Sequence, residues 1–132
     1  MRMHHVAAYV ADIEATAAFY EKYFAAKRNN MYHNPTTGLS TYFLTFGGDQ
    51  GGAALELMSR PGLAEDAEKS MRYGYIHVCI SVGSEESVDR LAERIRADGY
   101  EVLSGPRVTG DGMYECAIAD PDGNVVEITA GH

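Results

Sequence analysis

The chain has 132 residues, 45% of them hydrophobic, which suits one compact domain with a real core and is short for two domains. Its 19 acidic residues outnumber 11 basic ones, and a formal net charge of -8 would repel phosphate backbones and anionic lipid headgroups. Nucleic-acid and membrane-surface roles are therefore disfavoured. No stretch resembles a secretion signal or a membrane span, and both cysteines lie in apolar strand-like runs, so we expect a cytoplasmic protein.

The first half of the chain begins with a strand-like run at residues 5–11, which ends at Asp12, a good N-cap for a helix. Apolar residues then recur at helical spacing and form a stripe suited to packing on a sheet: Ile13, Ala17, Tyr20 and Phe24. Turn residues separate three further short strands, at about residues 30–33, 40–46 and 53–58.

The second half repeats this order. Residues 77–83 form a strand-like run before Ser84, a second N-cap, and an apolar stripe then continues to Gly99: Val88, Leu91 and Ile95. Three short strands follow at about residues 101–104, 113–118 and 125–129. The polar segment between the halves, residues 59–74, is predicted to be a linker with a short helix around residues 63–71, and it is a candidate lid.

Two tandem βαβββ modules explain this repeat. We expect an α+β fold with module 1 at about residues 1–58, the linker at 59–74 and module 2 at about 75–132, all within one domain. One such unit cannot cover its own sheet face, so the two are expected to form a curved, barrel-like mixed sheet around a cleft. A cleft of this kind is where a ligand site is expected.

Two glutamates interrupt apolar strands. Glu56 lies between Leu55 and Leu57, and Glu127 lies between Val126 and Ile128. Because strand neighbours point to opposite faces, both carboxylates are predicted to point away from the helices into the concave face. The same argument sends His5 and His77 to that face, at equivalent places in the two modules.

These four residues suggest a metal site. Two imidazoles and two carboxylates suit one divalent ion, with Zn or Ni favoured and Co, Mn or Fe possible, and leave positions open for substrate. The alternative is that the histidines are ordinary half-buried strand residues and the glutamates lie on a solvated face. A register slip that replaces His5 with His4 is a further alternative.

The chain resembles the vicinal oxygen chelate superfamily, which includes glyoxalase I, methylmalonyl-CoA epimerase, extradiol dioxygenases, and fosfomycin-resistance and bleomycin-binding proteins. The resemblance covers nearly the whole chain and rests on the residues at 5–6, 19–24, 55–57, 75–78 and 120–128. Glyoxalase I is similar in using His, Glu, His, Glu in this order, which corresponds to His5, Glu56, His77 and Glu127. The resemblance implies a divalent metal that binds two adjacent substrate oxygens and stabilises an enediolate, with Glu127 as first choice of base and Glu56 as second.

The substrate is less defined. Glyoxalase I has a first-strand arginine that holds a glutathione carboxylate, and Tyr9 stands there in this chain, so glutathione is not carried over as thiol partner. Arg60 and Arg107 could bind an anionic substrate or be plain loop charges. Further side chains that could line the site, or simply fill the core, are Tyr9, Met58, Cys79 and Tyr114.

The leading hypothesis is a glyoxalase I-like lyase or isomerase that acts on a small carbonyl compound or its thiol adduct, as a homodimer. The alternatives are a binding protein that sequesters an antibiotic or metabolite without turnover, and an extradiol-type dioxygenase. The dioxygenases of this family use three ligands, so Glu56 counts against the last.

Overall fold

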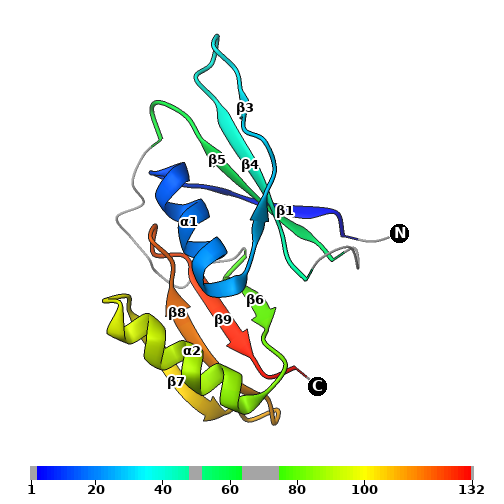
Figure 1. The fold of residues 1–132 in the computed structure, drawn as a ribbon, viewed down its shortest axis with the longest axis vertical. Coiled ribbons are helices and arrows are strands. Elements are labelled where there is room, and N and C mark those ends of the chain that lie inside the picture. The colour runs from blue at the N-terminus through cyan, green and yellow to red at the C-terminus, as the bar shows by residue number, and fades with distance from the viewer. Residues whose placement is uncertain (1–2, 48–51, 64–74, 132) are drawn as a thin grey trace. The chain divides into compact units, whose positions relative to one another are not determined.

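The chain forms two units, module 1 at residues 1–72 and module 2 at residues 73–132, which are described separately (Figure 1). The structure is a computed structural model that describes residues 3–47, 52–63 and 75–131. Each module has one helix packed on a mixed sheet, so the prediction of an α+β fold built from two modules is confirmed, and module 1 has one short strand more than predicted. The predicted helix around residues 63–71 and the candidate lid lie largely outside the described residues. Over the described part of the chain, neither helix is long and apolar enough to cross a membrane.

Module 1 contains α1 at Ile13–Phe24 and a sheet of five strands. The strands are β1 His5–Tyr9, β2 Lys27–Arg28, β3 Tyr32–His33, β4 Ser40–Thr45 and β5 Ala54–Ser59. The sheet order is β1-β5-β4-β2, with β3 also paired to β4, and only β1 and β5 run parallel. Asp12 caps α1 as predicted, because its Oδ1 accepts hydrogen bonds from the backbone N–H groups of Glu14 and Ala15.

Module 2 contains α2 at Glu85–Ala97 and a sheet of four strands in the order β6-β9-β8-β7. The strands are β6 His77–Ser81, β7 Val102–Val108, β8 Tyr114–Ala119 and β9 Val125–Thr129. The prediction that the strand after α2 stops at residue 104 is wrong, because β7 continues to Val108 through two register shifts against β8. Gly105 makes this possible: its φ is +79°, and an added Cβ would lie 2.7 Å from the backbone oxygen of Glu115.

In each module one sheet face is buried under the helix. Leu55 and Leu57 of β5 lie under α1, and Val126 and Ile128 of β9 lie under α2. Their strand neighbours Glu56 and Glu127 are only half-buried. The helices therefore select which residues of each central strand are available for chemistry on the opposite face.

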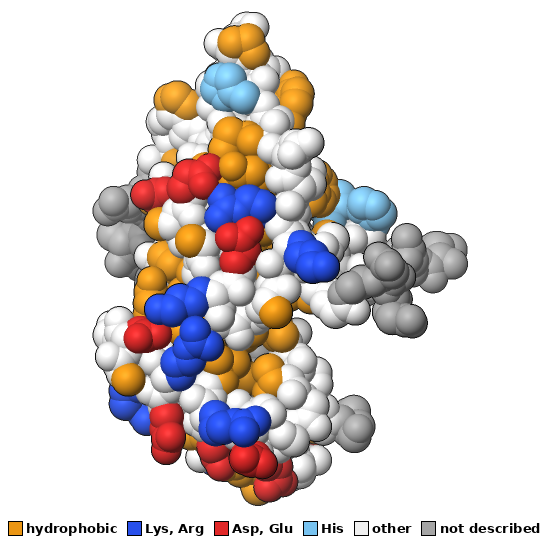
Figure 2. All heavy atoms as spheres, viewed as in Figure 1, with side chains coloured by type: hydrophobic (Ala, Val, Ile, Leu, Met, Phe, Trp, Pro, Cys, Tyr) orange, Lys and Arg blue, Asp and Glu red, His pale blue; other side chains and the backbone are white. Residues whose placement is uncertain are grey.

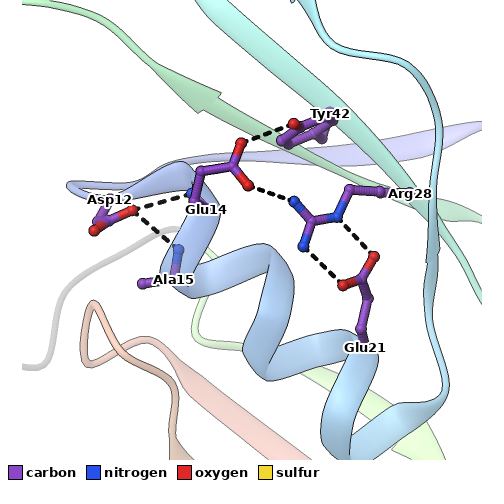
Figure 3. A network of polar contacts seen from close by, with 6 residues as sticks. All are labelled: Asp12, Glu14, Ala15, Glu21, Arg28 and Tyr42. Carbon is purple, nitrogen blue, oxygen red and sulfur yellow. Dashed lines mark hydrogen bonds and ion pairs between the residues drawn. The ribbon is translucent and has the colours of Figure 1, made fainter.

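Arg28 ties α1 to the sheet of module 1 (Figure 3). Its guanidinium donates two parallel hydrogen bonds of 2.7 Å to the carboxylate of Glu21 and one of 2.7 Å to Glu14. The guanidinium carbon lies 5.0 Å from the ring centroid of Tyr42, whose hydroxyl also donates to Glu14 over 2.7 Å. One side chain thus joins two helical carboxylates and an aromatic ring on β4.

Replacing Arg28 with methionine is expected to lower the free energy of unfolding by about 1–2 kcal/mol at pH 7, because the forked ion pair is lost from a site where the side chain is 23% exposed. Arg90→Met is the matched control. Arg90 is 68% exposed and pairs with Glu86 one helical turn away, on a part of α2 where acidic and basic side chains alternate (Figure 2). Loss of the Arg90 side chain should lower the free energy of unfolding by less than about 0.5 kcal/mol. Equal losses in urea unfolding of the two variants would contradict the proposed role of Arg28.

The same comparison has a defined pH dependence. The hydrogen bond from Tyr42 and then those from Arg28 lower the pKa of Glu14, and Arg28 lowers the pKa of Glu21, both from an ordinary value of 4.5. A carboxyl group whose pKa is lower in the folded state than in the unfolded state stabilises the fold at pH values above the unfolded-state pKa. This stabilisation is lost as the pH falls through the folded-state pKa. The stability difference between the chain and Arg28→Met should therefore be full at neutral pH and shrink below pH 4.5.

Candidate functional site

A histidine and a glutamate lie together on the exposed sheet face of module 1. The parallel register aligns His5 of β1 with Ala54 of β5, and Ala7 with Glu56, so the two side chains are diagonal neighbours on the same face. His5 Nε2 lies 3.5 Å from Glu56 Oε2. The imidazole is partly accessible, and the carboxylate is 14% exposed.

Module 2 repeats this arrangement in the same register. His77 of β6 aligns with Val125 of β9, and Cys79 aligns with Glu127. His77 Nε2 lies 3.1 Å from Glu127 Oε2, and this carboxylate is 22% exposed. The structure therefore brings His5 together with Glu56 and His77 with Glu127. Ligation of one ion by all four remains a prediction.

The spacing within each pair fits ligation of a divalent metal ion. If a histidine nitrogen and a carboxylate oxygen each lie about 2.1 Å from an ion and subtend an angle of about 90–110°, they are separated by roughly 3.0–3.4 Å. The observed separations of 3.5 and 3.1 Å are close to this range. Among the described residues no group of three or more His, Cys, Asp or Glu side chains is placed to hold a metal ion, and each module brings together one His-Glu pair.

The surroundings of His5 fix its ring. Phe43 of β4 contacts the imidazole edge to face, with ring centroids 5.3 Å apart and an interplanar angle of 88°. His4, which precedes β1, places its Nδ1 2.8 Å from Nδ1 of His5. Both Nδ1 atoms are thus engaged with each other, and His5 directs Nε2 toward Glu56. His4 contacts the candidate ligand in this structure and does not replace it.

Three of the residues predicted to contact substrate share the face of the His-Glu pairs. Tyr9 aligns with Met58, and both are separated by an even number of residues from His5 and Glu56 on their strands, so they point to the same face. Cys79 aligns with Glu127. Arg107 of β7 aligns with Glu115 of β8 and lies 3.9 Å from its carboxylate, while donating a 3.1 Å hydrogen bond to Ser104 Oγ. Arg60 is exposed directly after β5.

Tyr114 lies on the other face. It shares the parity of the buried Cys116 and Ile118, and its hydroxyl donates a 2.6 Å hydrogen bond to Asp89 of α2, which raises the pKa of Tyr114 to about 12. Its neighbour Glu115, which the sequence analysis missed, occupies the Glu127 side, where it aligns with Thr129. The signal was available, because Tyr114 and Cys116 flank Glu115 as Val126 and Ile128 flank Glu127.

The two cysteines differ in access and in acidity. Cys79 is exposed on the site face, and burial of its sulfur, followed by the charges of Glu127 and Glu115, raises the pKa of its thiol. Cys116 is fully buried under α2, and burial raises its pKa to about 11. At neutral pH both thiols are therefore protonated.

Thiol labelling with an aromatic disulfide reagent at pH 8 should modify one cysteine per folded chain, Cys79, and more slowly than free cysteine because the thiolate fraction is reduced. Glu127→Gln should accelerate the reaction, since it removes one of the charges that raise the pKa of Cys79. Cys79→Ser provides the control, in which the folded chain should not react. Equal labelling of both cysteines in the folded chain would show that this account is wrong.

The sequence profile of the Glyoxalase/Bleomycin resistance protein/Dioxygenase superfamily matches residues 2–128. The lactoylglutathione lyase of Salmonella typhimurium is 30% identical over 130 residues, which cover 97% of this chain and 91% of that protein. A solved structure of a glyoxalase I mutant from Zea mays has a TM-score of 0.79 at 27% identity; the match covers 98% of this chain and 44% of the maize chain. FosX, a fosfomycin resistance protein from Listeria monocytogenes, was solved with Mn(II) and sulfate and has a TM-score of 0.71 at 23% identity. The match covers 98% of this chain and 92% of the FosX chain, and it shows likeness of fold alone.

Proposed function

Because the chain belongs to the glyoxalase/bleomycin resistance protein/dioxygenase superfamily, we propose that it is a divalent-metal-dependent enzyme of the glyoxalase I type. It would isomerise a small carbonyl compound or the adduct of that compound with a thiol. The observation that carries this proposal is the duplicated His-Glu pair, which has one strand register and one side of the sheet in both modules. A solvated face of unrelated polar residues gives no reason for such a repeat.

In the proposed site His5, Glu56, His77 and Glu127 together hold one Zn or Ni ion, and Co, Mn or Fe would suit the same nitrogen and oxygen donors. A bound divalent ion would stabilise negative charge on two adjacent oxygens of the substrate. The protein's own contribution is to fix the donors: parallel pairing sets the diagonal spacing, and Phe43 and His4 orient the imidazole of His5.

The chemical step that we propose is a proton transfer between neighbouring carbon atoms. The carboxylate of Glu127 accepts a proton from the hydroxyl-bearing carbon beside the carbonyl group and returns it to the carbonyl carbon, while the hydroxyl proton passes to the former carbonyl oxygen, so the substrate is isomerised without an external oxidant or reductant. Glu127 is preferred over Glu56 because its carboxylate is more exposed, 22% against 14%. Glu56 is the second candidate.

Other residues of the same face are proposed to position the substrate. Tyr9, Met58 and Cys79 would contact its uncharged part, and Arg107 and Arg60 would bind an anionic group. We do not assign Tyr114 a contact, because its hydroxyl is bound to Asp89 on the helix side. The homodimer and the cytoplasmic location stay predictions that rest on the family likeness and on the two free cysteines.

Metal binding is the first test. The chain, purified without a chelating tag, should bind about one equivalent of Ni or Zn, and Glu56→Gln, Glu127→Gln or His77→Ala should each weaken binding at least about tenfold. Glu115→Gln is the matched control, because Glu115 shares the face of Glu127 but, among the described residues, its ion-pair partner is Arg107 and not a histidine. Fewer than about half an equivalent bound, with none regained on adding Ni or Zn, would refute a metal enzyme and favour a metal-independent binding protein.

Turnover is the second test. Methylglyoxal should be assayed with glutathione and with other low-molecular-weight thiols, on protein loaded with Ni or Zn. Glu127→Gln should lower kcat by about a hundredfold or more, as expected for loss of a general base, and Glu56→Gln should lower it less. Arg90→Met, on the exposed side of α2, should behave as the unchanged chain. Full activity in both glutamine variants would exclude the proposed roles.

A further inference from the structure

The two modules differ beside their glutamates. Glu56 has Ala7 on one neighbouring strand and Phe43 on the other as its aligned partners. The corresponding partners of Glu127 are Cys79 and Ala117. On the side away from the histidine-bearing strand, therefore, module 1 has a phenyl ring where module 2 has only a methyl group.

The ring in module 1 has an evident packing role. Phe43 is half-buried, and its ring lies edge to face on His5, so it occupies the sheet surface directly beside the His5-Glu56 pair. Ala117 is also half-buried, but its side chain ends at Cβ and cannot extend over His77 or Glu127. The difference is one benzene ring in volume, placed next to one carboxylate and absent next to the other.

The two carboxylates also differ in exposure. Glu127 is 22% exposed and Glu56 is 14% exposed, although the two occupy the same register relative to their histidines. Beside Glu127 the side chain on β8 thus ends at the Ala117 methyl group, next to the more exposed of the two carboxylates.

We propose that the substrate lies against module 2 with an apolar substituent of about aromatic size beside Ala117 and Glu127, and that Ala117 sets the size limit for this substituent. This inference rests on the proposed function and narrows its substrate class to carbonyl compounds that bear such a group next to their two adjacent oxygens. Phe43, which packs on His5, is the matching residue of module 1.

The test uses two probes that carry adjacent oxygens but differ in size, acetohydroxamate and benzohydroxamate, titrated into the full chain loaded with Ni. Ala117→Phe copies the module 1 residue into module 2. This variant should weaken the binding of benzohydroxamate about tenfold or more. The affinities for acetohydroxamate and for the metal should change by less than about threefold. Arg90→Met, on the exposed side of α2, is the control and should leave the ratio of the two dissociation constants within about threefold of that of the unchanged chain.

Ala117→Leu covers the case in which Ala117→Phe fails to fold or to load metal, and it should shift the ratio in the same direction by a smaller factor. An unchanged ratio in the folded Ala117 variants, or no hydroxamate binding to the metal-loaded chain, would overturn the inference. Failure of the proposed function has a different signature: the ratio would respond to Ala117 as expected while no dicarbonyl compound is turned over with any thiol. The two failures are thus separable.

Discussion

The parallel pairing of the first and last strands in each module is the constraint on which the candidate site depends. β1 lies beside β5 and β6 beside β9, and the register places the imidazole one step away from the carboxylate along the diagonal. A shift of one residue in β5 would turn Leu55 and Leu57 out of the core and bury Glu56 under α1. Both changes are costly, because apolar surface would be exposed and an unpaired carboxylate would be desolvated. Core packing therefore fixes the separation of His and Glu.

Neighbouring residues of β4 show how the two faces share one strand. Tyr42 points toward α1, where its hydroxyl binds Glu14 and its ring lies under Arg28 (Figure 3). The next residue, Phe43, points to the other face and packs on His5. The Arg28 network thus anchors the strand whose opposite side orients a candidate ligand. An interaction with no part in the chemistry contributes to the geometry of the site.

Much of this could be read from the sequence, because alternation of residue types reports the face of a strand. The Leu-Glu-Leu and Val-Glu-Ile patterns predicted that Glu56 and Glu127 face away from the helices, and the repeat predicted two equivalent modules. Contacts across strands were not readable in this way. The contact of Phe43 with His5 joins residues far apart in the chain, and the ion pairs of Arg28 join residues 7 and 14 positions away, so no local pattern predicts them. The two-residue strand β2 and the continuation of β7 past Pro106 are further features that depend on a partner strand.

The repeat also gives the protein two copies of the same strand arrangement, so each position in one module has a matching position in the other. Positions 43 and 117 occupy matching places, and one carries a ring that steadies an imidazole while the other is reduced to a methyl group. The register that spaces the donors is the same in both modules, so the residue at either position can change without moving the backbone that holds its glutamate. In the duplicated arrangement the strand register holds the donors, and other residues of the same face can determine which ligand binds. The two matching positions therefore decide what lies beside each glutamate, while the strand register alone holds the donors.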